Sequence, residues 1–338
     1  MNEMKSIVVL SDEQLLHQFK LGDFNSIDAN GWNMLMQVLY KKENILTDEQ
    51  LLYLMKKTNL LHCDGEGSNA LMIAFNSFKA LSPGLYDYLL THSDLNQLHK
   101  YSKMNALMLG LERSEASYTG FSLNLSQWEY LIDNTNLKQV NIENSDAMQY
   151  AFRYHNKLSK LQIQKLLDNC DISLKSNSGL NALMYACIFN KRNNLNLSQE
   201  QWECLIEKSD ISCCSPIGNY NALSLALKYN EVEELNLKKH HFLTIIDKMQ
   251  LMSEKGEQLL LMVLKSLCKD GVVFSSFTAL WDYFDDKRYL LNFIEKQGQD
   301  YSCYLQWPEI VAFKEKKLLE QNTVNAVLNN KTTKIKKI

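Results

Sequence analysis

The sequence predicts an all-α fold: a solenoid of helical hairpins, repeated about seven times, with a helical cap at its C-terminal end. Two recurring patterns lead to this prediction. A tetrad of the type Asn-Ala-Leu-Met recurs along the chain, and a helix-start signature lies between successive tetrads. Glycine (12) and proline (3) are scarce among the 338 residues, which disfavours folds with many strands and turns.

The tetrad marks the first helix of each repeat. Its copies start at Asn33, Asn69, Asn105, Asp146, Asn181, Asn221 and Gln258, so successive starts lie 35–41 residues apart. Asn and Asp are good N-caps, because the side-chain oxygen accepts a hydrogen bond from an unpaired amide of the first turn. We therefore interpret the recurring Asn as a cap rather than a ligand, and the recurring Met as packing between repeats.

The helix-start signature marks the second helix of each repeat. A leucine comes first, at positions 10, 46, 81, 123, 158, 197 and 237, and Ser, Thr or Asn follows it in six copies. Gln lies three residues beyond this cap in five copies, which is the pattern of a capping box. Apolar residues four, seven and eight past the cap complete one helical face. Lys238, Leu85 and His241 depart from the cap and Gln positions, and Gln18 departs from the apolar face in the first copy.

Such a two-helix unit cannot bury its apolar side alone, so neighbouring units stack. Separate amphipathic helices in a globular bundle, the alternative, would not need the same cap in six of seven copies. We expect a repeat array over 1–264, a helical cap or small domain over 265–328, and a basic flexible tail over 329–338. Leu290–Ile294 and a start at Pro308 indicate helices in the second segment, whereas the lysines of the tail lack an apolar face.

Charge and composition disfavour several classes of function. Lys and Arg (36) against Asp and Glu (39) give a net charge of −3, so no chain-wide basic field favours nucleic acid. No run of about 18 apolar residues predicts a membrane span. Eight cysteines scattered over a long chain are typical of reduced, mostly buried thiols, so we expect a soluble, cytoplasmic protein.

Motifs of catalysis and metal binding are not found. The sequence holds no phosphate loop, dinucleotide fingerprint or zinc-protease motif, so we expect no cofactor, no metal and no catalytic residue. Cys204, Cys213 and Cys214 lack the spacing of a zinc site and are interpreted as packing and loop thiols. His240 and His241 begin a helix, and we expect both to be solvated.

The segment after residue 264 contains no histidine, because all seven histidines precede residue 242. A Cys-His or Ser-His catalytic unit confined to that segment is therefore excluded. We interpret its carboxylates Asp282, Asp285 and Asp286 as a solvated cluster.

The repeat resembles the ankyrin repeat in a divergent form. The ankyrin consensus opens its first helix with Thr-Pro-Leu-His-x-Ala after a Gly-containing turn, and Gly67–Ala74 and Gly179–Ala186 follow that pattern. Leu89–Asp94 and Leu205–Asp210 loosely match the end of its second helix. The resemblance covers 10–264. Asn-Ala replaces Thr-Pro, the period exceeds the family's 33 or so, and the connector between the helices is longer. An unnamed helical-hairpin repeat remains the alternative.

The resemblance implies a non-catalytic scaffold or adaptor that binds a partner protein on the concave face of the solenoid. The alternative function is an array that targets an enzymatic C-terminal segment, as in bacterial effectors that act on host proteins. Such an effector would work in a host cytosol. Neither a small-molecule cofactor nor nucleic acid is an expected partner.

Candidate binding residues follow from the places that contact partners in ankyrin arrays. At the loop tips these are Trp32, Tyr101, Met104, Leu180 and Tyr220. Seven and eight residues past the tetrad starts they are Tyr40, Lys41, Arg113, Arg153, Tyr154, Phe189, Lys228 and Tyr229. Tyr, Trp and Arg dominate interface energies because they bury large areas at low entropic cost. In the alternative interpretation these aromatic residues pack beneath the connectors 111–122, 189–196 and 228–236, and both interpretations stay open at this point.

Overall fold

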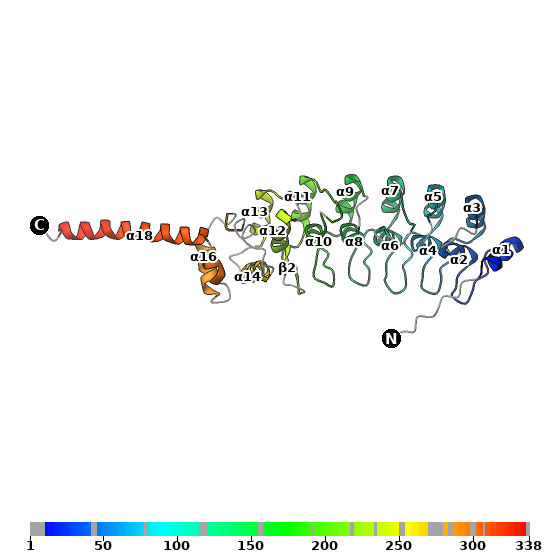
Figure 1. Ribbon diagram of the computed structural model, residues 1–338, viewed down its shortest axis with the longest axis horizontal. Helices are drawn as coiled ribbons and strands as arrows, with labels where there is room; N and C mark the ends of the chain where they lie inside the picture. Colours follow the sequence, from blue (N-terminus) through cyan, green and yellow to red (C-terminus); the bar gives the residue numbers. More distant parts are fainter. Residues whose placement is uncertain are drawn as a thin grey trace.

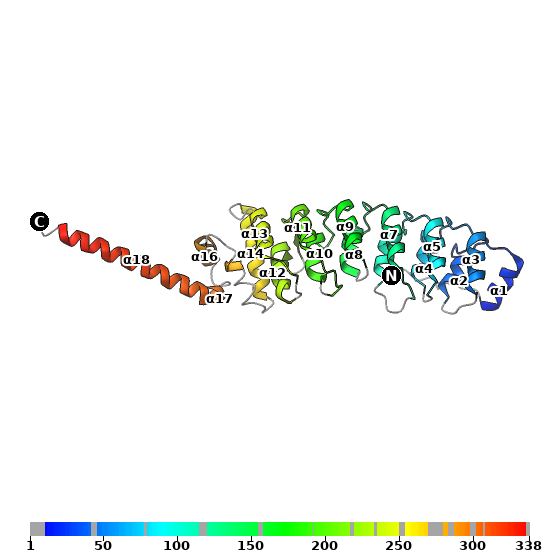
Figure 2. The ribbon, with the colours of Figure 1, turned by 90° about the horizontal axis from the view of Figure 1, so that it is seen from above.

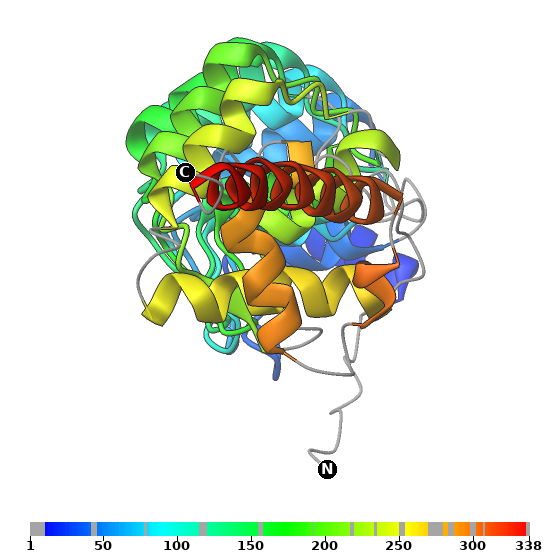
Figure 3. The same ribbon diagram turned by 90° about the vertical axis from the view of Figure 1, so that its left-hand side faces the viewer.

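The computed structural model is an elongated stack of helical hairpins that ends in one projecting helix (Figure 1). The residues that it describes are 11–41, 46–77, 80–114, 120–154, 158–190, 192–216, 220–232, 235–249, 254–269, 280–282, 287–297, 302–306 and 308–335. Seen from above, the successive units lie side by side along the long axis (Figure 2). The view along that axis shows them stacked behind one another (Figure 3).

The first helices of the units form an inner row. They are α2 (Met34–Tyr40), α4 (Ala70–Phe75), α6 (Ala106–Arg113), α8 (Ala147–Tyr154), α10 (Ala182–Phe189) and α12 (Ala222–Val232). Each follows directly on the Asn or Asp of a tetrad, whose Oδ1 accepts a hydrogen bond from the third helical amide, as from Met72 to Asn69 at 3.1 Å. The predicted caps are thereby confirmed. Each inner helix packs against its neighbours in the row and is largely buried.

The second helices form an outer row. They are α1 (Asp12–Leu21), α3 (Asp48–Lys57), α5 (Pro83–His92), α7 (Leu125–Asn134), α9 (Lys160–Asn169), α11 (Gln199–Lys208) and α13 (Lys239–Lys248). The predicted capping boxes are present at Ser11, Thr47, Asn124, Ser159 and Ser198. Ser82 makes no side-chain cap bond, and Pro83 begins its helix instead.

Three of the five capping glutamines also join neighbouring units, which the sequence patterns did not predict. Their Nε2 atoms donate to backbone carbonyls at the start of the preceding outer helix, from Gln127 to Pro83 at 2.8 Å, from Gln162 to Leu125 at 2.7 Å and from Gln201 to Lys160 at 2.9 Å. Each bond satisfies a buried amide and fixes the spacing of two outer helices.

Four of the five tetrad asparagines form a second ladder. Their Nδ2 atoms donate to carbonyls farther along the solenoid, from Asn69 to Asp94, Asn105 to Asn136, Asn181 to Asp210 and Asn221 to Leu259, at 2.8, 3.3, 2.9 and 2.9 Å. An Asn therefore caps one helix with its oxygen and holds the chain that leads to the next unit with its nitrogen. Asp146 has no such nitrogen.

A finger-like loop precedes each inner helix. Two residues before the tetrad the backbone has a positive φ, at Gly31, Gly67, Lys103, Asn144 and Gly179. Backbone amides link adjacent fingers, from Gly65 to Asn30, Lys100 to Glu66, Ile142 to Ser102 and Asn177 to Glu143. The last finger contains the short antiparallel pair β1 (Cys214–Ser215) and β2 (Tyr220–Asn221). A turn-rich finger with two helices is the plan of an ankyrin repeat, so the predicted all-α, ankyrin-like solenoid is confirmed.

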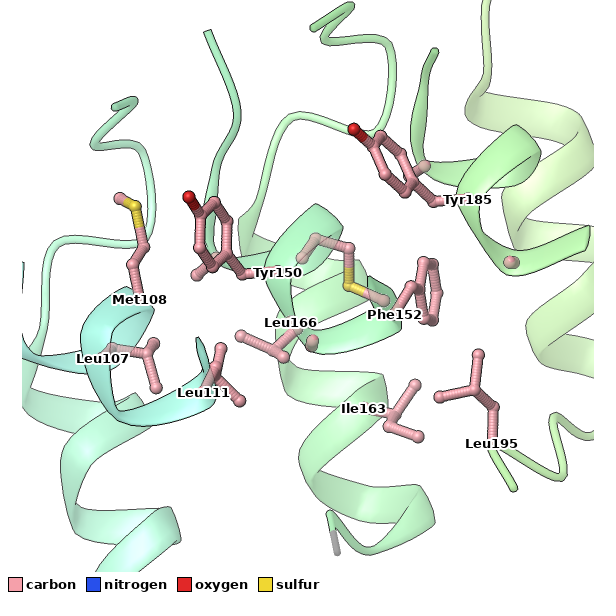
Figure 4. Packing of buried hydrophobic residues seen from close by; sticks show 14 of the residues in the cluster. Leu107, Met108, Leu111, Tyr150, Phe152, Ile163, Leu166, Tyr185 and Leu195 are labelled. Carbon is pink, nitrogen blue, oxygen red and sulfur yellow. The ribbon is translucent and has the colours of Figure 1, made fainter. Parts of the chain in front are cut away.

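One continuous apolar core runs through the stack. Figure 4 shows how adjacent units share it: Leu107 and Leu111 of α6 face Tyr150 of α8, and Phe152 lies between Leu166 and Leu195. Each such side chain contributes about 1.5–3 kcal/mol when fully buried. A unit removed from the stack would expose these faces, which explains why the repeats fold together.

The C-terminal part continues the helical stack. It contains α14 (Glu254–Lys269), α16 (Lys287–Lys296), α17 (Ser302–Leu305) and α18 (Pro308–Ile335). The hydroxyl of buried Tyr304 donates to the Leu264 carbonyl at 2.8 Å and ties α17 to α14. Because α14 crosses the expected boundary between 264 and 265, the array and the cap share a helix.

The tail predicted to be flexible is helical as far as it is described. Residues 329–335 continue α18, and 336–338 lie outside the described residues. Once a helix is nucleated, each further residue adds a backbone hydrogen bond even without an apolar face. Within the described stretches, no helix combines the length and the apolar character needed to cross a membrane.

Candidate protein-binding surface

The inner helices and the fingers border one long surface, which we call the inner face. Its helical side consists of the residues seven and eight past each tetrad start. The predicted residues on this side are all half-buried: Tyr40, Lys41, Arg113, Arg153, Tyr154, Phe189, Lys228 and Tyr229. Their aromatic rings pack against the core and keep an accessible edge. These side chains are therefore held in place and remain within reach of a ligand.

A groove of about 520 Å³ opens on the inner face between α8, α10 and two fingers. Its lining residues are Glu143, Arg153, Ser176, Asn177, Ser178, Leu180, Tyr185, Ile188 and Phe189. Three of the predicted residues, Arg153, Leu180 and Phe189, meet here. The ring of Tyr185 stacks on that of Phe189 with centroids 6.1 Å apart, so one wall is aromatic.

One end of the groove is charged. Arg153 Nη1 lies 3.4 Å from Glu143 Oε2, and the guanidinium lies 4.9 Å from the centre of the Tyr154 ring. Because the ion pair is largely exposed, it contributes little to stability. Burial raises the pKa of Tyr154 against the opposing charge of Arg153, so the phenol is neutral and available as a hydrogen-bond donor.

Cation and aromatic pairs recur farther along the inner face. The guanidinium of Arg192 lies 5.9 Å from the Phe189 ring, and Lys228 Nζ lies 4.9 Å from the ring of Tyr220 and 5.3 Å from that of Tyr229. Such pairs are worth about 0.5–1 kcal/mol at exposed sites. The face thus presents aromatic edges and positive charge over three consecutive units.

Two predicted residues are not part of an accessible surface. Trp32 is 5% exposed, and its Nε1 donates to Asp64 Oδ2 at 2.9 Å. Met104 is also 5% exposed, and the Tyr150 hydroxyl donates to its sulfur at 3.5 Å. The prediction was wrong for both, because the chain folds back at the base of the finger and covers these side chains. Tyr101, farther out on its finger, is 58% exposed.

Sequence reasoning missed Tyr185 and Glu143 as lining residues. A signal for Tyr185 exists, because a residue four past the tetrad start lies on the same helical face as the residue eight past it. Glu143 has no such signal. It reaches the groove only because its finger is hydrogen-bonded to the next one, with Asn177 donating to its carbonyl at 2.8 Å.

Glu203, His240 and His241 are the only three potential metal ligands that lie close together in the described part of the chain. Glu203 Oε1 is 3.3 Å from His240 Nε2 and 3.9 Å from His241 Nε2. However, His241 Nδ1 accepts a hydrogen bond from the Lys238 amide at 3.0 Å. A neutral ring that accepts at Nδ1 carries its proton on Nε2, so it offers no lone pair there to a metal. The arrangement does not fit a metal ion.

His241 instead takes the place of the capping glutamine. Its Nδ1 accepts the hydrogen bond that a glutamine Oε1 accepts in other units, and its Nε2 faces Glu203 as Gln127 Nε2 faces Asp87 three units earlier. At 1% exposure His241 is buried, so the expectation of a solvated ring was wrong for it, whereas His240 is exposed. Burial and the neighbouring His240 lower the pKa of His241 and keep it neutral.

The cysteines and the carboxylates of the C-terminal segment are further potentially reactive side chains. The described cysteines are unpaired thiols. Burial raises the pKa of Cys187 to about 12 and that of Cys213 to about 11, which keeps both protonated and unreactive. Asp282 is exposed, and Asp285 and Asp286 lie outside the described residues.

No protein-family model matches the chain, and no curated protein matches its sequence. Solved structures that are similar in fold include the following two. One is a chain from the complex of a predatory endopeptidase of Bdellovibrio bacteriovorus with an immunity protein (18% identity, 58% of this chain and 90% of that chain covered, TM-score 0.38). The other is the ankyrin repeat domain of Bcl-3, a member of the IkappaB family (17% identity, 66% and 90% covered, TM-score 0.42). On the architecture of its own repeats, the chain has the fold of a divergent ankyrin-like array.

Proposed function

We propose that the protein is a non-catalytic scaffold that binds a partner protein on the concave, inner face of its solenoid. The observation that supports this most is the groove between α8 and α10, where Arg153, Leu180 and Phe189 converge. An aromatic wall with one cation and one carboxylate at its edge provides both the large contact area and the polar specificity of an interface hot spot.

The rigidity of the array also favours binding. Bonds of the Gln and Asn ladders join the units on both sides of the groove, and Asn193 Nδ2 donates to the Phe152 carbonyl at 2.7 Å. A surface that is ordered before the partner arrives loses little entropy on association. We place this activity in a reducing compartment, since the described cysteines are unpaired. That compartment is the cytosol of the producing cell, or of a host cell if the protein is delivered there.

Affinity capture with the full chain as bait tests this proposal. Proteins retained by the wild type are compared with those retained by Tyr154→Ala and Phe189→Ala. We expect both substitutions to reduce recovery of the same partner about tenfold or more, because each removes an aromatic contact. Tyr130→Ala is the matched control, since Tyr130 is 36% exposed on the outer helix α7.

Folding of the variants is checked by circular dichroism and thermal unfolding. If an aromatic variant does not fold, Arg153→Ala replaces it, because that side chain is only part-buried at the edge of the groove. A partner that binds the folded variants of this face (Tyr154→Ala, Phe189→Ala or Arg153→Ala) as tightly as the wild type would show that this face is the wrong one.

A further inference from the structure

The tips of two neighbouring fingers carry exposed apolar side chains. Tyr101, on the finger before α6, is 58% exposed, and Ile142, on the finger before α8, is 66% exposed. The amide of Ile142 donates to the Ser102 carbonyl at 2.9 Å, so the two tips adjoin. Turns favour Gly, Asn, Asp and Ser, and an isoleucine that is exposed to solvent in a turn does not stabilise the fold.

Three exposed lysines lie on the finger of Tyr101 and on the finger that follows that of Ile142. Lys100 Nζ lies 5.7 Å from the Tyr101 ring, and Lys103 is two residues farther along the same finger. Lys175 begins the next finger, where its carbonyl accepts a hydrogen bond from Asn144 at 2.7 Å. In the stretches that the structure describes, no carboxylate pairs with any of the three lysines. We call Lys100, Tyr101, Lys103, Ile142 and Lys175 the fingertip ridge.

Glu143 and Glu66 are carboxylates that lie near the ridge. Glu143, next to Ile142, pairs with Arg153 at 3.4 Å, whereas Glu66 lies 3.7 Å from His99 Nε2, which carries a charge only when the ring is protonated. With three lysines against one carboxylate that lacks a permanent cation partner, the ridge is a locally positive surface on a chain with a net charge of −3. Local charge of one sign steers a partner of the opposite sign and orients it on arrival.

The ridge is held in a fixed shape. Asn141 Oδ1 accepts hydrogen bonds from the Glu143 and Ser145 amides at 3.0 and 2.9 Å, which closes the finger on itself. Asn177 Nδ2 donates to the Ile142 carbonyl at 3.1 Å and clamps that finger to the next one. Because Glu143 also lines the groove, the ridge and the groove are contiguous.

We propose that the fingertip ridge is a second docking surface, and that it binds an acidic segment of a protein partner through an apolar anchor residue. The anchor lies against Tyr101 and Ile142, and flanking Asp or Glu side chains pair with Lys100, Lys103 and Lys175. This inference rests on the proposed protein-binding role and adds the chemistry of the partner. A nucleic acid fits the ridge less well, because Ile142 offers no flat ring on which a base would stack.

Selection from a display library of short random peptides on the immobilised full chain tests the proposal. We expect the selected peptides to place an aromatic or large aliphatic residue among Asp and Glu residues. Labelled copies of these peptides should bind about tenfold more weakly to Ile142→Ser and to a Lys103→Glu, Lys175→Glu double variant, as measured by fluorescence anisotropy. Added salt should weaken the binding as well.

The controls match the ridge variants in chemistry but not in place. Leu161→Ser removes a 78% exposed apolar side chain from the outer helix α9, and Lys160→Glu reverses an exposed charge beside it. Both should leave peptide binding unchanged. Thermal unfolding of every variant confirms that the fold is retained.

Three results would overturn the assignment of the ridge. Selected peptides could lack acidic residues, or they could bind ridge variants and wild type equally. A labelled single-stranded oligonucleotide could also bind the wild type and lose binding in the lysine variant, which would make the ridge a nucleic-acid surface.

The same variants distinguish the ridge from the groove. Peptides whose affinity falls with Phe189→Ala but not with ridge changes would support the proposed function and reject the ridge alone. Peptides that respond only to ridge changes would support the ridge and argue against the groove.

Discussion

The Nε2 atom of Gln201, near the start of α11, donates a hydrogen bond of 2.9 Å to the backbone carbonyl of Lys160, the first residue of α9. Its Oε1 accepts a hydrogen bond of 3.0 Å from the amide of its own cap, Ser198. One amide group therefore caps a helix and ties it to the preceding unit. A glutamate would still accept the bond from the Ser198 amide but could not donate to the Lys160 carbonyl, which gives a physical reason for Gln rather than Glu at this place.

Gln201→Glu is expected to destabilise the array by about 1–3 kcal/mol, because a buried carboxylate would face a carbonyl without a donor between them. The favourable helix dipole offsets about 0.3–1 kcal/mol of this loss. Urea unfolding at neutral pH measures the difference. Gln50→Glu is the control, since Gln50 forms the same capping box at an exposed position and should tolerate the change. An equal loss of unfolding free energy in both variants would contradict the stabilising role that we assign to the bond from Gln201 to Lys160.

Asp146→Asn is expected to stabilise the protein most at alkaline pH. Asp146 occupies a tetrad position that is Asn in five other units, and burial raises its pKa from 3.8 to about 7. Between these two pKa values the Asp146 carboxyl is protonated in the folded state and ionised in the unfolded state. The free energy of unfolding therefore falls as the pH rises from about 4 to 7, and it stays reduced at higher pH. An amide removes this loss and supplies the missing donor.

Thermal unfolding at pH 5 and pH 8 measures this effect. We expect Asp146→Asn to gain about 1–3 kcal/mol at pH 8 and much less at pH 5. The reverse change, Asn105→Asp, should lose stability at pH 8, because Asn105 Nδ2 donates to Asn136 and its side chain is fully buried. A pH-independent gain at position 146 would argue that packing, not charge, is responsible.

Gly179→Ala should cost more stability than Gly22→Ala, although both glycines have a positive φ, +80° and +75°. A Cβ at Gly179 would collide with the Cys214 carbonyl oxygen and touch Pro216, whereas none of the described atoms lies within 4 Å of a Cβ at Gly22. The backbone strain alone costs about 1–2 kcal/mol, and the collision adds to it at Gly179 only. The two denaturation midpoints compare the variants directly. Similar midpoints would mean that the finger moves freely away from its neighbour.

Local signals made most of the helix starts predictable. Thr47 and Gln50 lie three residues apart, so their capping box is visible in the sequence itself. The partner of Gln201 lies 41 residues away, and no local pattern distinguishes that carbonyl from any other. The fold could be derived from the caps, whereas the ladders that hold its units together needed the structure.

The binding surface was predictable only in part for the same reason. Arg153 and Phe189 follow from helical position alone, and both line the groove. Trp32 was assigned to a loop tip, yet its indole is drawn inward by Asp64 of the next finger, 32 residues farther along. Residues whose orientation depends on a neighbouring unit are therefore the ones that sequence position misplaces.

His241→Gln is expected to remove a loss of stability at acid pH. Burial and His240 lower the pKa of His241 below its ordinary value of 6.5, so the unfolded chain binds a proton more readily than the folded one. Stability therefore falls as the pH drops below about 6.5, and it is fully present above that value. Glutamine keeps the acceptor that the Lys238 amide requires and does not titrate. At pH 5 the variant should have a higher free energy of unfolding than the wild type, and at pH 8 the two values should be nearly equal.

Added zinc should not change the unfolding midpoint of the wild type at pH 8, because the proton on His241 Nε2 leaves no lone pair there for a metal. A zinc-dependent rise of the midpoint that His241→Gln abolishes would show instead that the cluster with Glu203 binds metal.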